Sequence, residues 1–331
     1  PSEGSRANES VSCDVCHSIT ATTRDGYPYN FSYEMDPGKT EYSSRKGETS
    51  SPAHKIETRE IFSTNVFGGN CHNEKSPYDV WVKATQKEFV EGPYDEAGYE
   101  CQTCHMPKAK AKTASMGTEY DDTRLHLFNG AHDDGKVQGT IELSVYSDVS
   151  ETVPGDVAKI TTTLFNQKTG HKFPTGSVED RIVWLHVEAE DAEGNKYHLK
   201  VDKKGFEGEE YTIASDAMAY QDMGVSLDKP NFEGVQREDV PIGDRIFRMP
   251  YFDPQGRMTI QQWNTASLGV DYRFGPRETK METFTFNIPF EAAPGEMKIY
   301  AVLNYRKLVK PVAEYLGVPE EARTVKVNEA S

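Results

Sequence analysis

The chain has 331 residues, enough for about two domains, and 36% of them are hydrophobic, with a mean hydropathy of -0.70. No run approaches the roughly 18 apolar residues of a transmembrane helix, so the composition predicts a soluble protein without a membrane span. The formal net charge of -16 argues against nucleic acid as a partner, because phosphates require a basic surface.

Two copies of one short motif, C-x-x-C-H, lie in the first third of the chain. Its two thiols can each add to a vinyl group of a porphyrin while the adjacent imidazole reaches the iron, so the motif is the attachment signal for c-type haem. Paired cysteines also occur in zinc sites, but zinc does not explain a histidine directly after both pairs. The motifs therefore predict two haem c groups, with these cysteines and proximal histidines: Cys13, Cys16 and His17; Cys101, Cys104 and His105.

A third segment, Phe67-Gly-Gly-Asn-Cys71-His72, has the same ending but has Gly68 where the first cysteine would stand. We expect a third haem here, held through a single thioether at Cys71 and by His72 on the iron. The alternative is that Cys71 is free, buried or paired elsewhere.

The segment after this motif has the signals of a helix. Ser76 suits an N-cap, Pro77 the first turn, and Gly92-Pro93 the end of the helix. Apolar residues at helical spacing, among them Trp81 and Phe89, would form one face. We expect the first domain, residues 1–136, to combine such helices with loops around the haems.

From about residue 137 the pattern changes to alternating apolar and polar residues. Such runs bounded by turns predict β-strands, and several of them in succession predict a β-sandwich. The predicted fold class is therefore α+β and irregular, with a multihaem domain at 1–136 and a β-sandwich at 137–331, interrupted by a long insertion at about 203–280. The strands are expected around Ile141–Val145, Ala158–Leu164, Val183–Ala189, Tyr197–Val201, Phe284–Ile288, Met297–Tyr305 and near Val325.

The sixth position of each haem iron decides between electron transfer and catalysis, because a second histidine closes the iron to substrates. His186 and His198 alternate with apolar residues in predicted strands and are interpreted as structural. Four other histidines, in irregular or turn-rich segments, are the candidates for the distal ligands: His54, His126, His132 and His171.

Four segments resemble the exported multihaem c-type cytochromes in which a CQxCHMP-bearing haem region precedes a β-rich C-terminal domain. They are Gly98-Tyr-Glu-Cys-Gln-Thr-Cys-His-Met-Pro107, His126-Leu-Phe-Asn-Gly-Ala-His132, and Gly170-His-Lys-Phe-Pro-Thr-Gly176 with Trp184-Leu-His-Val187. The resemblance implies closely spaced, mostly bis-histidine haems that pass electrons in the periplasm or outside the cell. It also implies that His126 or His132 caps a neighbouring haem. Gly68 departs from the family pattern.

We therefore expect an electron-transfer protein with two or three haems rather than an enzyme. Its partners would be redox proteins or other haem subunits, and it could form a homo-oligomer or filament. The alternative is an oxidoreductase that acts on a small substrate at an open haem. Because haem c is attached outside the cytoplasm in bacteria, we expect an exported protein whose signal peptide is not part of this sequence.

Overall fold

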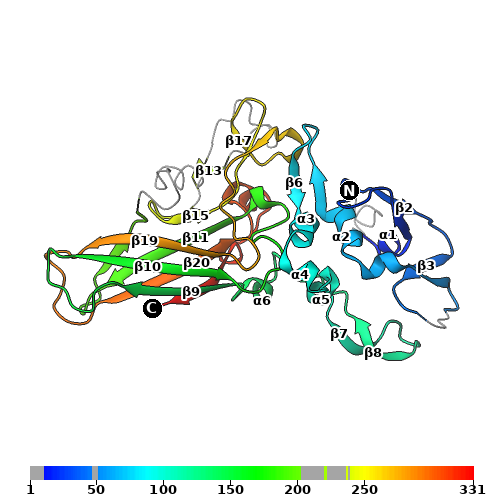
Figure 1. Cartoon of the computed structure of the whole chain (residues 1–331), viewed down its shortest axis with the longest axis horizontal. Helices are drawn as coiled ribbons and strands as arrows, with labels where there is room; N and C mark the ends of the chain where they lie inside the picture. The colour runs from blue at the N-terminus through cyan, green and yellow to red at the C-terminus, as the bar shows by residue number, and fades with distance from the viewer. Residues whose placement is uncertain (1–10, 47–50, 203–219, 222–235, 238) are drawn as a thin grey trace. The chain divides into compact units, whose positions relative to one another are not determined.

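The computed structural model describes residues 11–46, 51–202, 220–221, 236–237 and 239–331. The chain divides into two compact units: unit 1 consists of Pro1–Lys75 and Ala84–Phe128, and unit 2 of Ser76–Lys83 and Asn129–Ser331 (Figure 1). Much of the predicted insertion, at 203–219, 222–235 and 238, lies outside the described residues. In the described part, no helix has the length and hydrophobicity needed to cross a bilayer.

Unit 1 is built from short helices and small sheets, as expected for an irregular haem-binding region. Its helices are α1 Cys13–His17, α2 Asn65–His72, α3 Thr85–Val90, α4 Pro93–Glu96 and α5 Cys101–His105, with a 3-10 helix at Glu60–Ser63. Its strands are β1 Ile19–Thr22 and β2 Tyr33–Met35, β3 Thr40–Ser43 and β4 Lys55–Thr58, β5 Asn73–Lys75, and β7 Lys108–Lys112 and β8 Glu119–Arg124. The first and last of these pairs are antiparallel, and β3 and β4 are parallel.

Unit 1 buries few hydrophobic side chains. Among its described residues, those that are fully buried are Ile19, Tyr42 and Phe89. Polar side chains hold its segments together instead. Asn73 is buried, and its side-chain amide donates to the Pro28 carbonyl at 2.9 Å and to Gln86 Oε1 at 2.7 Å.

The helix predicted from Ser76 is wrong in its first half. Asp79 lies in the left-handed region with φ 61°, and its N–H donates to the Ser76 carbonyl, so the chain turns before a helix can begin. Strand β6 Trp81–Ala84 follows, and helix α3 begins only at Thr85. The sequence signals for capping were present, but the buried side chain of Val82 packs in a cluster with residues of unit 2.

The two largest antiparallel sheets in the described part of unit 2 confirm the strands predicted by alternation. One sheet has the order β19-β10-β9, and the other has β12-β11-β20-β21, with β15 also paired to β11. The strands are β9 Ile141–Ser147, β10 Val157–Asn166, β11 Ile182–Glu190, β12 Lys196–Leu199, β15 Arg245–Phe247, β19 Thr279–Asn287, β20 Lys298–Arg306 and β21 Thr324–Ala330.

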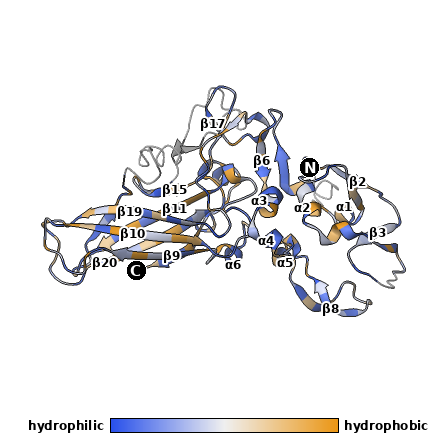
Figure 2. Cartoon of the chain, viewed as in Figure 1, coloured by the Kyte–Doolittle hydropathy of each residue, from blue (hydrophilic) through white to orange (hydrophobic). Residues whose placement is uncertain are grey.

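The inward-facing residues of both sheets pack into one hydrophobic cluster. Ile160 and Leu164 of the first sheet belong to it together with Leu185 and Leu303 of the second, all at most 1% exposed. Hydrophobic and hydrophilic residues accordingly alternate along these strands (Figure 2). The shared cluster explains why a pattern of period two dominates this half of the sequence.

Smaller elements complete unit 2. They are α6 Asp134–Val137, β13 Tyr220–Gln221, β14 Gln236–Arg237, β16 Tyr251–Phe252, β17 Met258–Thr259, β18 Ser267–Leu268 and α8 Lys310–Tyr315, with 3-10 helices at Val178–Asp180, Gln262–Asn264 and Glu320–Ala322.

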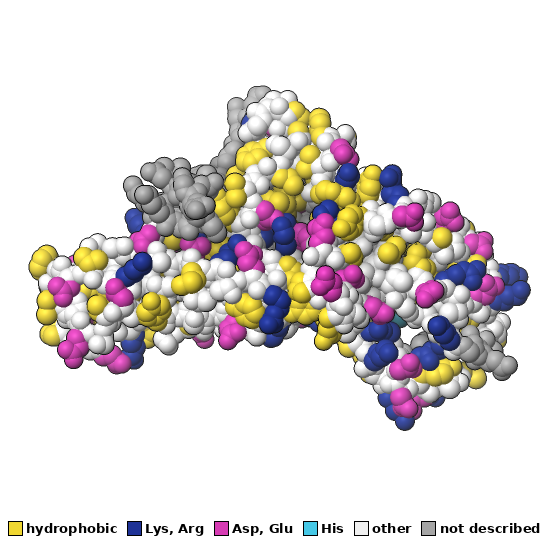
Figure 3. Space-filling model, in the orientation of Figure 1, with side chains coloured by type: hydrophobic (Ala, Val, Ile, Leu, Met, Phe, Trp, Pro, Cys, Tyr) yellow, Lys and Arg dark blue, Asp and Glu magenta, His cyan; other side chains and the backbone are white. Residues whose placement is uncertain are grey.

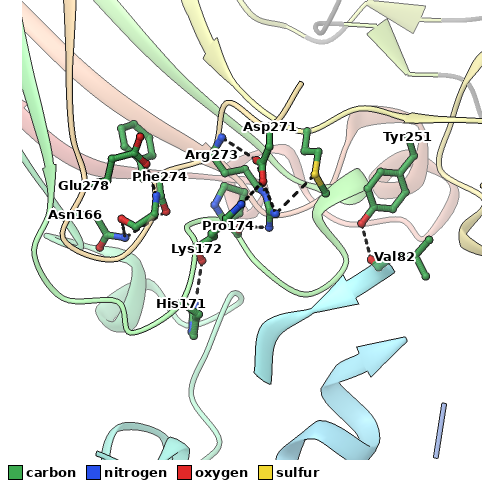
Figure 4. A network of polar contacts seen from close by, with 12 residues as sticks. Val82, Asn166, His171, Lys172, Pro174, Tyr251, Asp271, Arg273, Phe274 and Glu278 are labelled. Atoms are coloured by element: carbon green, nitrogen blue, oxygen red, sulfur yellow. Dashed lines mark hydrogen bonds and ion pairs between the residues drawn. The ribbon is translucent and has the colours of Figure 1, made fainter. Parts of the chain in front are cut away.

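A charged network holds the turn-rich loop that carries His171 (Figure 4). The Asp271 carboxylate accepts hydrogen bonds from Arg273 Nε at 2.8 Å and from Lys172 Nζ at 2.6 Å. Arg273 also donates to the Pro174 carbonyl at 3.1 Å, so one carboxylate ties two parts of the loop together. Burial alone would raise the pKa of Asp271, but Arg273 and Lys172 outweigh it and hold the pKa below its usual range.

Replacing this carboxylate tests the network. We expect Asp271→Asn to lower the free energy of unfolding by about 3 kcal/mol at pH 7, because it leaves the buried Arg273 guanidinium without its counter-ion. A depressed carboxyl pKa stabilises the fold above the unfolded pKa, so the difference from the wild type should shrink as pH falls below 3.8, the ordinary aspartate value. Urea titrations followed by circular dichroism would measure both effects.

The matched control is Asp121→Asn. Asp121 pairs with Lys110 at 3.5 Å, but both side chains are largely exposed, so its loss should have little effect. Equal destabilisation by the two substitutions would contradict a structural role for Asp271.

Candidate haem sites

The first C-x-x-C-H motif forms helix α1, with His17 as its last residue. Cys13 and Cys16 are three residues apart, so their thiols lie on the same face of the helix. His17 Nδ1 donates to the carbonyl of Tyr42 at 2.6 Å. Tyr42 is buried in β3, and its hydroxyl donates to Asp36 Oδ2 at 2.6 Å. The bond from His17 Nδ1 to the Tyr42 carbonyl sets the tautomer of His17 and leaves its Nε2 as the nitrogen with a lone pair.

His126 lies beside His17. Their ring centroids are 6.0 Å apart with an interplanar angle of 34°, and His126 Nδ1 donates to the carbonyl of Arg124 at 3.1 Å. Each ring therefore uses Nδ1 for a backbone hydrogen bond, which leaves Nε2 as the lone-pair nitrogen. The Phe62 ring stacks on the His17 ring, with their centroids 5.6 Å apart.

The second motif forms helix α5. Glu100 and Thr103 form a capping box at its start: the Glu100 side chain accepts from the Thr103 N–H, and the Thr103 hydroxyl accepts from the Glu100 N–H. The Asn65 side chain accepts from both the backbone N–H and the Sγ of Cys101, at 2.9 and 3.3 Å. Burial raises the pKa of the Cys101 thiol to about 11.

Arg124 connects the second motif to His126. Its guanidinium donates to the Gln102 carbonyl at 2.9 Å and to Glu100 Oε2 at 3.1 Å. Downstream, the Phe128 N–H donates to the carbonyl of His105 at 3.2 Å. The segment that carries His126 therefore lies along helix α5, while the His126 ring lies beside the histidine of the first motif.

The incomplete third motif lies at the end of helix α2, where His72 is the last residue. Cys71 is exposed as a residue, but its sulfur is partly shielded from water. This partial burial raises the pKa of the Cys71 thiol, and the nearby Cys16 thiol raises it further. Gly68, three residues earlier, faces the second motif: a Cβ added there would lie 3.9 Å from Cys101 Sγ. The α2 helix therefore has neighbours in both complete motifs.

None of the five cysteines, all of which lie in the described residues, forms a disulfide. Nor do the cysteines of the two complete motifs form a group of three or more metal-ligating atoms within 4.8 Å of one another, within the part of the chain that the structure describes.

The other predicted distal ligands lie in different surroundings. His54 is half-buried next to the start of β4, and its Nδ1 donates to the carbonyl of Lys55 at 3.1 Å. His132 belongs to unit 2, where its Nε2 accepts from Arg181 at 3.2 Å, and burial lowers its pKa with the help of Arg181 and Lys307. His171 also belongs to unit 2, and its Nδ1 donates to the Lys172 carbonyl at 2.8 Å (Figure 4).

Sequence reasoning missed the residues that orient these side chains. Tyr42 and Phe62 lie 25 and 45 residues after His17, and Asn65 lies 36 residues before Cys101. No local signal in the sequence marks these residues. Every residue has a backbone carbonyl, so the residue type of Tyr42 does not indicate that its carbonyl accepts a hydrogen bond from His17.

Among solved structures, the chain is similar to the crystal structure of a penta-haem cytochrome c552 from Thermochromatium tepidum. The TM-score is 0.63 at 18% identity, over 97% of this chain and 76% of that chain. At this identity the similarity shows the fold alone, so the chain has a fold like that of a multihaem cytochrome. No family model and no curated protein sequence matches the chain.

Two further structures match weakly. The sporulation control protein Spo0M from Bacillus subtilis has a TM-score of 0.19 at 12% identity, over 51% of this chain and 43% of that chain. A family 123 glycoside hydrolase from Clostridium perfringens has a TM-score of 0.22 at 9% identity, over 58% and 27%. These scores are too low to support any inference.

Two adjacent glycines of α2 provide a matched test of the packing around the third motif. Gly68→Ala should leave stability unchanged or raise it by up to about 1 kcal/mol, because alanine favours the helix and the added Cβ meets only an ordinary contact. Gly69→Ala should cost roughly 1–3 kcal/mol, because its Cβ would lie 2.8 Å from Pro28 Cγ and 3.0 Å from Gln86 Cδ. Urea unfolding measures the stability of both variants. The reverse order of stabilities would show that α2 packs differently.

Proposed function

We propose that this protein is an exported electron carrier with two or three c-type haems, and that it is not an enzyme. The observation that carries the proposal is the pair of His17 and His126 beside the thiols of helix α1. The similarity in fold to a penta-haem cytochrome supports the same conclusion.

The donor set of α1 fits haem c. An imidazole nitrogen lies about 2 Å from a bound metal and its ring centroid about 1 Å farther, so two imidazoles on opposite faces of one iron have centroids roughly 6 Å apart. The rings of His17 and His126 are 6.0 Å apart, and both have Nδ1 bonded to a backbone carbonyl. Cys13 and Cys16 would form the thioethers. His17 and His126 would hold the iron of a haem bound here, and the haem would supply a one-electron redox centre.

The second haem would be held by Cys101, Cys104 and His105, and a third by Cys71 and His72. The Tyr42 and Arg124 carbonyls orient the first pair of imidazoles, and the capping box and Asn65 orient α5. Among the predicted distal ligands, His54 belongs to the same unit as these two motifs, so we propose it as the distal ligand of one of these haems.

The hydrophobic content of unit 1 also supports the proposal. Its described residues include few buried apolar side chains, and several large ones, such as Phe31, Leu127 and Phe128, are more than half exposed. A unit of this size ordinarily needs more apolar burial to remain folded. Covalently attached porphyrins would supply apolar surface for these side chains.

The partners would be redox proteins, other haem subunits, or further copies of the chain. One lysine of β7 is paired within its own hairpin, because Lys110 lies 3.5 Å from both Glu119 and Asp121 of β8. Basic and acidic side chains are interspersed over the visible face (Figure 3). The net charge of -16 then favours a partner with a basic surface.

For the whole chain we propose a multihaem domain at 1–136 and a β-sandwich at 137–331 that is interrupted by a long insertion at about 203–280. The hydrophobic cluster shared by the two sheets supports the second assignment. The protein acts in the periplasm or outside the cell, where haem c is attached.

Replacing His126 tests the central pair. In the haem-containing protein, His126→Ala should convert one haem from low-spin to high-spin and allow it to bind carbon monoxide, because the iron loses one axial ligand. The matched control is Leu127→Ala, which removes an exposed neighbour, 55% accessible, and should keep the wild-type spectrum. Absorption and EPR spectra give the readout. An unchanged spectrum in His126→Ala would contradict this pairing.

Counting haems tests the composition of the protein. Intact mass should show two or three covalently bound haems, and Cys71→Ser should remove one if three are present. A wild-type spectrum that changes with cyanide, nitrite or carbon monoxide would favour the oxidoreductase alternative, because such ligands need an open iron.

A further inference from the structure

Three metal-ligating side chains converge on the outer face of the larger sheet of unit 2. His186 lies on β11, His198 on β12, and Asp244 directly precedes β15. Strands β12 and β15 both pair with β11: Val187 pairs with Leu199, and Leu185 pairs with Arg245. His186 therefore lies at the point where β11 passes from one partner strand to the other.

The Asp244 carboxylate lies within hydrogen-bonding distance of both imidazoles. Asp244 Oδ1 is 3.0 Å from His186 Nδ1 and 2.7 Å from His198 Nε2. The two rings stack with centroids 4.9 Å apart. Each of the three side chains offers one possible ligand atom, and these three atoms all lie within 4.8 Å of one another.

The burial of the three groups is uneven. The Asp244 side chain is fully buried, with 0% exposure, while those of His186 and His198 are 27% and 28% exposed. A buried carboxylate thus faces two imidazoles that remain accessible from solvent. An ion can reach the site without unfolding the sheet, and its charge would balance that of the carboxylate.

We propose that His186, His198 and Asp244 bind a divalent transition-metal ion, with Zn²⁺ as the best match. Two imidazoles and one carboxylate are a three-ligand set that zinc uses, with water in the fourth position. Ligand atoms about 2 Å from a tetrahedral ion lie roughly 3.3 Å apart, so small side-chain shifts from the observed distances are enough. The ion would fasten β12 and β15 to the same edge of β11.

The site is independent of haem, because its residues belong to the β-sheet of unit 2. Part of it could be found from the sequence. His186 and His198 lie on consecutive strands joined by a short turn and alternate with core residues, so both face outward. Asp244 could not be found in this way, because it follows His198 by 46 residues and reaches the site only through β15.

Zinc binding to the haem-containing protein tests the proposal. After dialysis against a chelator, isothermal titration with Zn²⁺ should show one site that weakens at least 100-fold in His186→Ala and in His198→Ala, because each removes one of three ligands, a larger change than loss of an outer-shell partner. Lys196→Ala is the matched control: Lys196 is exposed, bonds Glu188 at 2.7 Å beside the site, and offers no ligand that the proposal uses. The Zn²⁺ affinity of the Lys196→Ala variant should equal or exceed that of the wild type.

A second readout guards against variants that merely unfold. Zn²⁺ should raise the Tm of the wild type and of Lys196→Ala but not of either histidine variant, while the haem spectra of all four stay the same. Equal zinc affinity in wild type and histidine variants would overturn the proposal, as would the absence of zinc binding in the wild type. Either result would leave the three side chains as a hydrogen-bonded link between strands.

Discussion

Unit 1 has little hydrophobic core, and this shortage is the constraint on which its structure depends. Helices of five residues are not stable alone, because ordering the backbone of the first turn costs more free energy than its hydrogen bonds contribute. Helices α1 and α5 are held instead by polar side chains and backbone carbonyls from elsewhere in the unit. The bond from His17 to the Tyr42 carbonyl is one such link, and the bonds from Asn65 to Cys101 are another. The same links that position these helices also orient the groups that would bind haem.

Unit 2 rests on a different principle. Its two sheets bury one continuous apolar cluster, so its strands are stabilised mainly by removing hydrophobic surface from water. The outer faces are then free to carry polar groups, among them His186 and His198. Loops at the sheet ends are held by buried charge pairs such as Arg273 with Asp271. Unit 1, which is held by polar contacts, thus accompanies a β-unit that carries its own core.

The alternation of apolar and polar residues predicted the strands that bury one face. Strands β9, β10, β11, β19 and β20 follow from alternation, because one face of each is buried. The helix expected from Ser76 failed because tertiary packing prevailed over capping signals. Val82 is needed in a buried cluster with Tyr251, and the left-handed Asp79 turns the chain into an extended strand. The insertion between about 203 and 280 had no assignable pattern, and no element was predicted there.

The sequence by itself determined the chemistry of the attachment motifs, because C-x-x-C-H is contiguous and a thioether needs only cysteine. It also determined which histidines were available as second ligands. Only the tertiary structure decided that His126, rather than His54, lies beside His17, since that contact spans more than 100 residues and depends on Arg124 holding the segment against α5. The same reason applies to Asp244. Pairings between distant residues are set by packing, which no local pattern records.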